Sequence, residues 1–197
     1  DPVFLSDDLA ITTIDYLRNP TSEIPVSLDG FAAMIMMSGS AVLSIDTETY
    51  EVRPNMLVFF RPGSIIRTIR CSSDATAYLV ACSKAFGSDI QVDISASLPI
   101  HMRFGRKPCL QVTERDVAEI RQFFQLIKTV IQSDKERYRK EIIHTLFTAV
   151  FYLITELNQR EQSSEQKQGR CEVLFDQFMQ LLGEYNKRER NVSFYAR

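Results

Sequence analysis

The sequence predicts an α+β protein: an antiparallel β-barrel or sandwich, followed by an antiparallel α-helical hairpin and a further C-terminal helix. Three observations lead to this prediction. Residues 31–82 hold six short apolar segments separated by turn residues, which is typical of antiparallel all-β architectures. Residues 113–160 instead repeat apolar side chains at three- and four-residue steps, as amphipathic helices do. The same helical spacing returns at 174–185, after a polar stretch.

The bulk composition describes an ordinary globular chain. Its 197 residues are 45% hydrophobic and 24% charged, and the net charge of −2 gives no general reason to bind nucleic acid or an anionic membrane. No apolar run approaches the roughly 20 residues of a membrane span. The four cysteines lack metal-site spacing, and the two histidines, His101 and His144, lie far apart. We expect a cytoplasmic protein with reduced, mostly buried thiols, no metal and no cofactor.

The predicted barrel occupies residues 1–110. A first strand is expected at 10–18, and six more at 31–38, 41–46, 49–52, 56–61, 65–71 and 75–82. Several are apolar on both faces, so one face is expected to line the barrel interior and the other to pack on a second sheet or on helices. A short helix is possible at 84–91. The stretch beyond it, which holds Pro99, Gly105 and Pro108, is expected to be extended.

The predicted hairpin occupies residues 111–160. Its first helix begins at Thr113, whose hydroxyl suits an N-cap, and runs to 132; the second runs from about 135 to 160. Each helix is apolar over about half its circumference, more than the roughly 100° that one neighbour covers. Packing within the chain could use the whole arc. Alternatively, part of it is the interface of a homodimer, with the candidates Phe123, Leu126, Ile127, Val130, Phe147, Phe151 and Ile154.

The C-terminal part begins with a polar stretch. Residues 161–169 contain no apolar side chain and predict a flexible linker. Residues 170–197 predict an amphipathic helix, a basic elbow and the start of another helix. The basic side chains of the elbow are either candidates for DNA-phosphate contacts or a solvated turn, and they are Lys187, Arg188 and Arg190.

The layout of strands, hairpin, linker and final helix resembles the AraC/XylS family of bacterial transcription regulators. The most specific match is LFDQFMQLLGEYNKRERNVSFYAR at 174–197, which is similar to the first helix of the family's helix-turn-helix domain, in a spelling common in Bacteroidetes members. A second match comprises Gly39, the segment 50–56 and the turn Pro62-Gly63. The resemblance implies a cupin-like sensor barrel, a helical dimerisation hairpin, a linker, and the truncated start of a DNA-binding domain. Sequence-specific DNA binding would belong to the complete C-terminal domain.

The function implied by this resemblance is ligand sensing and dimerisation for a transcription regulator. The positions matching the family's pocket are Ile66, Thr68, Leu79 and Ala81, and by strand alternation Arg70 shares the face of Ile66 and Thr68. This interior is mostly apolar and small, which disfavours a polyhydroxy sugar. It suits either an unknown apolar or acidic effector, with Arg70 as counter-ion, or a filled core without ligand. The alternatives are therefore a metal-free small-molecule-binding cupin and a pure dimerisation module.

Enzymatic activity is not expected. Metal-binding cupins carry histidines before the position of Gly39 and a further one three residues after the Pro-Gly turn. This chain has no histidine before His101, and Ile66 occupies the last of those positions. The sequence also lacks a glycine-rich phosphate loop and a GxSxG elbow. His144 lies among apolar helix positions, which favours a packed side chain.

Overall fold

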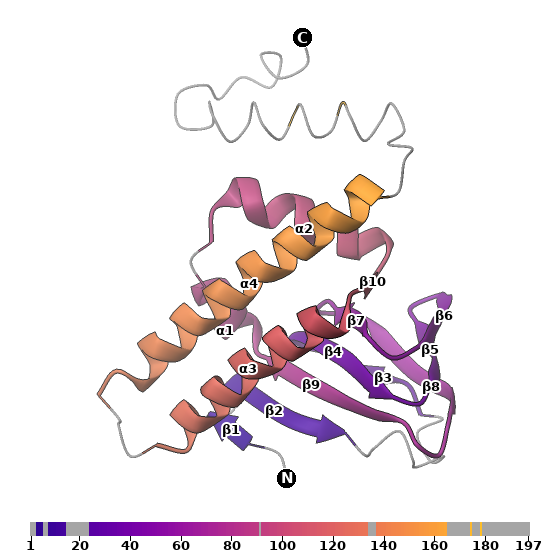
Figure 1. Cartoon of the computed structure of the whole chain (residues 1–197), viewed down its shortest axis with the longest axis horizontal. Coiled ribbons are helices and arrows are strands. Elements are labelled where there is room, and N and C mark those ends of the chain that lie inside the picture. Colours follow the sequence, from indigo (N-terminus) through magenta and orange to yellow (C-terminus); the bar gives the residue numbers. More distant parts are fainter. Residues whose placement is uncertain are drawn as a thin grey trace.

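The computed structural model of the chain describes residues 3–5, 8–14, 24–90, 92–133 and 137–164, together with Leu174 and Phe178. Two antiparallel sheets face each other (Figure 1). The six-stranded sheet contains, in order, β1 (Val3–Leu5), β2 (Leu9–Ile14), β9 (Thr76–Cys82), β4 (Phe31–Ser38), β7 (Met56–Phe60) and β10 (Cys109–Gln111). The four-stranded sheet contains β3 (Val26–Ser27), β8 (Ile65–Cys71), β5 (Ala41–Ile45) and β6 (Glu48–Val52).

The strand pairs are nested. β2 pairs with β9, β3 with β8, β4 with β7 and β5 with β6, and successive pairs alternate between the two sheets. A long hairpin rolled up in this way is a jelly roll, the architecture of cupins. β1 and β10 extend the six-stranded sheet at its two edges. The predicted fold class, an α+β protein with a cupin-like antiparallel barrel, is confirmed.

The six strands predicted between 31 and 82 lie within one residue of their expected ends. Turn residues between them explain this accuracy, because several adopt the left-handed backbone that ends a strand. Gly39 has a φ of 67° between β4 and β5, and Asp46 and Asn55 have φ angles of 55° and 64° in the next two turns. The short strands β1, β3 and β10 were not predicted, since segments of two or three residues carry no periodicity.

The prediction of an extended stretch through Pro99 was wrong. After α1 (Lys84–Asp89), the chain forms the helix α2 (Ile94–Arg106). An internal proline costs a helix about 3 kcal/mol. Ile100 and Phe104, one turn apart, are each only 5% exposed. Burial of two such side chains contributes about 1.5–3 kcal/mol each, which offsets the proline.

The predicted helical hairpin is present as α3 (Glu114–Ile131) and α4 (Arg139–Ser164), which run side by side in opposite directions (Figure 1). Residues 161–164, which were predicted to begin the linker at 161–169, instead continue α4. Glu161 forms an ion pair with Arg103 of α2, and both side chains are largely buried. This ion pair fixes the polar end of α4 to α2, and the spacing of apolar residues in the sequence could not indicate it. The rest of the predicted linker lies outside the described residues.

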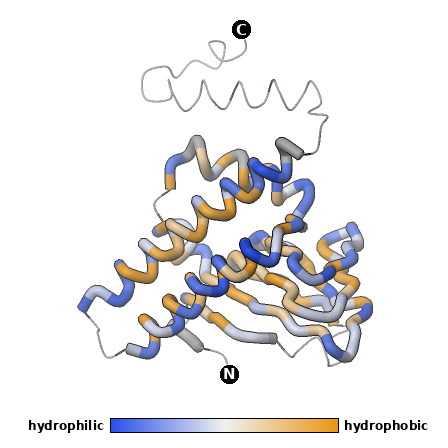
Figure 2. Tube along the Cα trace, viewed as in Figure 1, coloured by the Kyte–Doolittle hydropathy of each residue, from blue (hydrophilic) through white to orange (hydrophobic). Residues whose placement is uncertain are grey.

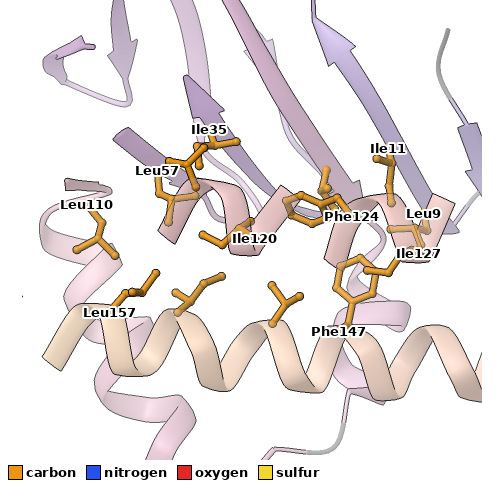
Figure 3. Packing of buried hydrophobic residues seen from close by; sticks show 14 of the residues in the cluster. Leu9, Ile11, Ile35, Leu57, Leu110, Ile120, Phe124, Ile127, Phe147 and Leu157 are labelled. Atoms are coloured by element: carbon orange, nitrogen blue, oxygen red, sulfur yellow. The ribbon is translucent and has the colours of Figure 1, made fainter. Parts of the chain in front are cut away.

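Two hydrophobic cores result. The inner core fills the barrel and includes the fully buried Met36, Val52, Val58 and Ala77. The outer core lies between the six-stranded sheet and the hairpin, where side chains of the sheet, α3 and α4 meet (Figure 3). Figure 2 shows the hydrophobic positions recurring in short bands along α3 and α4, as such packing requires. The expectation that strands apolar on both faces are covered on both faces is thus confirmed, with helices on the outer face.

The start of α3 is tied to the end of α4 by a buried carboxylate. Asp116 accepts hydrogen bonds from the backbone N–H and the hydroxyl of Thr113, as part of a capping box. It also forms an ion pair with Arg160, whose Nη2 lies 2.6 Å from Asp116 Oδ1. Burial acts to raise the pKa of Asp116, but the hydrogen bonds from Arg160 and Thr113 outweigh it and hold this pKa below the ordinary value of an aspartate. A carboxyl group whose pKa is lower in the folded than in the unfolded protein stabilises the fold at any pH above the unfolded-state pKa. This contribution is lost as the pH falls through the folded-state pKa.

Asp116→Asn is therefore expected to reduce the free energy of unfolding at neutral pH by about 1–2 kcal/mol, through loss of the cap and the charge pair. The difference from the wild type should shrink as the pH falls below the unfolded-state pKa, and it should disappear once the pH has passed the lowered folded-state pKa, where the carboxyl of the folded wild type is itself protonated. Urea unfolding at neutral and acidic pH measures both effects. Glu114→Gln, in the same helical turn, is the matched control and should cost only a few tenths of a kcal/mol. A difference that persists unchanged in acid would contradict the role of Asp116.

Candidate functional site

A cavity of about 210 Å³ lies between the outer face of the six-stranded sheet and the helices that cover it. Its floor comes from β4, β7 and β9, and its walls from α1, α2, α3 and α4. The lining is almost wholly apolar, with Phe124 of α3 and Phe147 of α4 on the hairpin side. Figure 3 shows both rings in the space between the sheet and α4. The cavity therefore lies outside the barrel, between it and the hairpin.

The register of β4 with its two neighbours arranges the outer face of the sheet in rows. Ile35 pairs with Leu57 and Tyr78, Ala33 with Phe59 and Val80, and Phe31 with Cys82. The first row packs into the outer core, the second forms the cavity floor, and the third forms its edge. Arg61 follows β7 and belongs to the edge row. The side chains in the three rows are, in order, Leu57, Ile35 and Tyr78; Phe59, Ala33 and Val80; and Arg61, Phe31 and Cys82.

The hollow exists because a small residue sits between large ones. Ala33 occupies the middle of the floor row, and its methyl group fills little of the space under the helices. On one side Phe59 stacks on Phe104 of α2, with ring centroids 3.9 Å apart, and this contact holds α2 above the sheet. In the edge row, Phe31 packs against Gly87 of α1, where an added Cβ would lie 2.7 Å from the ring. The aromatic rings therefore act as spacers.

Three side chains bring polar atoms to this cavity. Arg61 is half exposed and lies 3.9 Å from Asp46, measured from Nη2 to Oδ2. His101 is exposed; its Nδ1 lies 2.8 Å from the carbonyl oxygen of Ser97, and its ring meets Phe31 edge to face. Burial raises the pKa of the Cys82 thiol to about 11, although a hydrogen bond with the backbone of Phe31 opposes the shift. Cys82 is therefore a protonated thiol at neutral pH, unsuited to nucleophilic chemistry.

The positions predicted as pocket candidates inside the barrel, for which a filled core was the alternative, lie at its inner core. Ile66, Leu79 and Ala81 pack against the buried cluster there, and Thr68 pairs with the buried Leu43. Their inward direction agrees with the alternation argument. None of them lines the cavity described above.

The prediction that Arg70 shares the face of Ile66 and Thr68 was wrong. β8 contains a β-bulge: Leu43 pairs with Thr68, but its neighbour Val42 pairs with Arg70, so one residue of β8 is extra. That residue is Ile69, which is 51% exposed. A bulge shifts the alternation by one residue, so Arg70 lies on the solvent face of the sheet and is exposed. It is no counter-ion for a ligand inside the barrel.

The other predicted sites are placed as follows. Ile127, Phe147 and Ile154 are buried in the outer core of the chain itself, so their assignment to a dimer interface was wrong. Phe123, Val130 and Phe151 are partly buried against the same core, and Leu126 is 49% exposed. His144 is packed edge to face on Phe86, with ring centroids 4.6 Å apart. The basic candidates Lys187, Arg188 and Arg190 lie outside the described residues.

Two further properties concern the described residues only. They contain no group of three or more His, Cys, Asp or Glu side chains placed to hold a metal ion. No helix in this part of the chain is both long and apolar enough to cross a membrane. Of the four cysteines, which were predicted to be reduced and mostly buried, Cys109 is buried and Cys71 and Cys82 are half-buried, while Cys171 lies outside the described residues.

No protein-family model matches the chain, and no curated protein matches it either. Solved structures that resemble it include a Ralstonia eutropha protein described as a proposed mannose-6-phosphate isomerase, with 18% identity and a TM-score of 0.36 over 42% of this chain and 82% of that one. The cupin domain of a Schizosaccharomyces pombe protein has 9% identity and a TM-score of 0.35, over 45% of this chain and 66% of that one.

A third similar structure is an RmlC-like cupin with a double-stranded β-helix fold from Methanocaldococcus jannaschii. It has 9% identity and a TM-score of 0.31, over 38% of this chain and 67% of that one. At such identities and TM-scores the likeness says nothing of activity. The fold assignment rests on the nested strand order of the barrel.

Proposed function

We propose that the chain binds a small, mostly apolar ligand in the cavity between the sheet and the helices. The cavity itself is the observation that carries this proposal. Its volume of about 210 Å³ exceeds the ~150 Å³ of an apolar cavity that binds benzene. In proportion to volume, the cavity has room for a ligand of about eight to ten non-hydrogen atoms. An apolar lining with a few polar groups at one edge is the usual design of a small-molecule site. A polyhydroxy sugar would find few partners there.

The position of the cavity suits a sensor. A ligand in it would touch the barrel through Ala33 and Val80 and the hairpin through Phe124 and Phe147. It would therefore favour the arrangement in which the hairpin packs closely on the sheet, because a ligand shifts a conformational equilibrium by its differential affinity for the two states. We include in the proposal that the chain is the ligand-sensing and dimerisation region of an AraC-type regulator, on the strength of the sequence resemblance.

The binding test uses octanol as an apolar probe, measured by isothermal titration calorimetry. Ala33→Phe is expected to weaken octanol binding by about tenfold or more, because the larger ring occupies the floor of the cavity. Val42→Phe is the matched control, since it adds a ring to the outer face of the other sheet and should leave binding unchanged. If Ala33→Phe fails to fold, Ala33→Val is used instead, because its smaller side chain fills less of the cavity. Failure of octanol to bind the wild type, or equal binding to the variants, contradicts the proposal.

Self-association is proposed to use the part of the hairpin that the chain leaves uncovered. Along α3, Leu126 is half exposed, and the partly buried Phe123 and Val130 lie three and four residues on either side of it. These three residues belong to the set predicted for the interface, and the chain itself does not bury them fully. Analytical ultracentrifugation tests it, and a monomer across the whole micromolar range would count against a homodimer.

The regulatory part of the proposal requires binding to DNA through the C-terminal domain. Selection of duplexes from a random-sequence pool by the full-length protein, with and without octanol, tests it directly. A sequence-specific pool whose affinity changes with octanol supports a ligand-sensing regulator. Octanol binding by a full-length protein that selects no DNA sequence favours a small-molecule-binding cupin without a regulatory role.

A further inference from the structure

The polar groups of the cavity gather at one edge rather than being scattered over its walls. Ala33 pairs with Phe59 and Ala32 with Phe60, so continuing the register by one residue sets Phe31 opposite Arg61. Phe31 also pairs with Cys82 on its other side and meets the ring of His101. The floor row one step inward, in contrast, is wholly apolar. A ligand that matches this lining has one polar end and an apolar body.

Among the described residues that line the cavity, Arg61 carries the charge, and its present partner, Asp46, holds it weakly. The ion pair with Asp46 is long, at 3.9 Å, and the two side chains are 50% and 44% exposed, so it contributes little to stability. Asp46 has a stronger bond of its own, because its Oδ1 accepts the backbone N–H of Ile65 at 2.9 Å. The guanidinium can therefore turn to another anion without leaving a buried charge unpaired.

The guanidinium lies at the edge of the cavity, close to α2. Its Nη1 is 3.3 Å from the position that a Cβ would take on Gly105, so it rests against α2 beside Phe104. Arg61 also follows Phe59 by two residues, which directs it to the same face of the sheet. A single ligand could therefore place an anionic group on Arg61 and an apolar chain or ring over Ala33.

From this geometry we infer that the ligand is an amphipathic carboxylic acid. Its carboxylate binds the Arg61 guanidinium at the solvent edge, and its apolar body fills the hollow between Ala33 and the helices. Arginine is suited to this because its planar fork can donate two parallel hydrogen bonds to one carboxylate. The inference rests on the proposed function and specifies the chemical class of its ligand.

The test compares octanoate with octanol, which share an apolar chain and differ at the polar end. Calorimetric titration at neutral pH is carried out with the wild type, Arg61→Gln and the control Arg67→Gln. Arg67 is an exposed arginine on the solvent face of the four-stranded sheet, so its replacement makes the same change in charge away from the cavity. Arg61→Gln is expected to weaken octanoate binding by about tenfold or more and to leave octanol binding unchanged. Arg67→Gln should change neither.

The outcomes separate this inference from the proposed function. If octanol and octanoate bind the wild type equally, and Arg61→Gln alters neither, the carboxylate assignment is overturned while the apolar site stands. Equal loss of octanoate binding in Arg61→Gln and Arg67→Gln would show a general charge effect and would also overturn it. If neither probe binds the wild type, the proposed function fails first. Thermal unfolding of each variant verifies that its fold is intact.

Discussion

Ile127→Ala is expected to reduce the free energy of unfolding by about 2–5 kcal/mol. Ile127 is fully buried in the outer core, on the face of α3 that lies between the six-stranded sheet and α4 (Figure 3). Removing most of its side chain loses the transfer free energy of the buried carbons and leaves a hole that the two packed layers close only in part. Urea unfolding followed by circular dichroism measures the effect.

Leu126→Ala is the matched control for this experiment. Leu126 is the preceding residue of the same helix but is 49% exposed, so its truncation should cost less than about 1 kcal/mol. A loss below about 1 kcal/mol for Ile127→Ala would contradict the packing of α3 on the sheet. A large loss for Leu126→Ala, with a melting temperature that rises with protein concentration, would place Leu126 in an interface between two copies of the chain.

Gly39→Ala is expected to cost about 2–4 kcal/mol, the sum of backbone strain and overpacking. Gly39 has a φ of +67°, and an added Cβ would lie 2.6 Å from backbone atoms of Ala75 and closer still to the Ser72 hydroxyl. That hydroxyl accepts the backbone N–H of Ser40 at 2.8 Å, so moving it breaks a contact that holds the β4–β5 turn against the turn between β8 and β9. Chemical unfolding of the variant gives the cost.

Gly63→Ala separates the two causes. Gly63 also has a positive φ, of +86°, but nothing lies within 4 Å of the position of an added Cβ. This variant therefore carries only the strain of the left-handed backbone, about 1 kcal/mol. If Gly39→Ala costs no more than Gly63→Ala, the close approach at the β4–β5 turn does not contribute to stability.

Much of the fold could be predicted because local chemistry determines it. Residues that tolerate a positive φ, such as Gly39, Asp46 and Asn55, divide the barrel into strands whose ends are therefore visible in the sequence. Thr113 and Asp116 mark the start of α3 in the same way, through their capping box. The helical spacing of apolar residues then identifies both helices of the hairpin.

The candidate site was less predictable, because it depends on contacts between distant segments. The apolar outer face of β4 was the available signal, and it indicated that helices or a sheet cover this strand. It did not indicate that Ala33 leaves a hollow, since that depends on Phe59 and Phe104 holding α2 above the sheet. Arg70 was misplaced because the bulge at Ile69 arises from pairing with β5 and leaves no trace in the alternation.

The sequence by itself determined the elements: the strands with their turns, the two amphipathic helices, and strands that are apolar on both faces. Only the tertiary structure decided which faces meet, that α2 forms despite Pro99, that Ile127 is buried while Leu126 is exposed, and that Arg61 rather than Arg70 lies at the edge of a cavity. The physical reason is that backbone preferences act within a few residues. Hydrophobic burial is non-directional, so the partner of each apolar face is selected only when the whole chain packs.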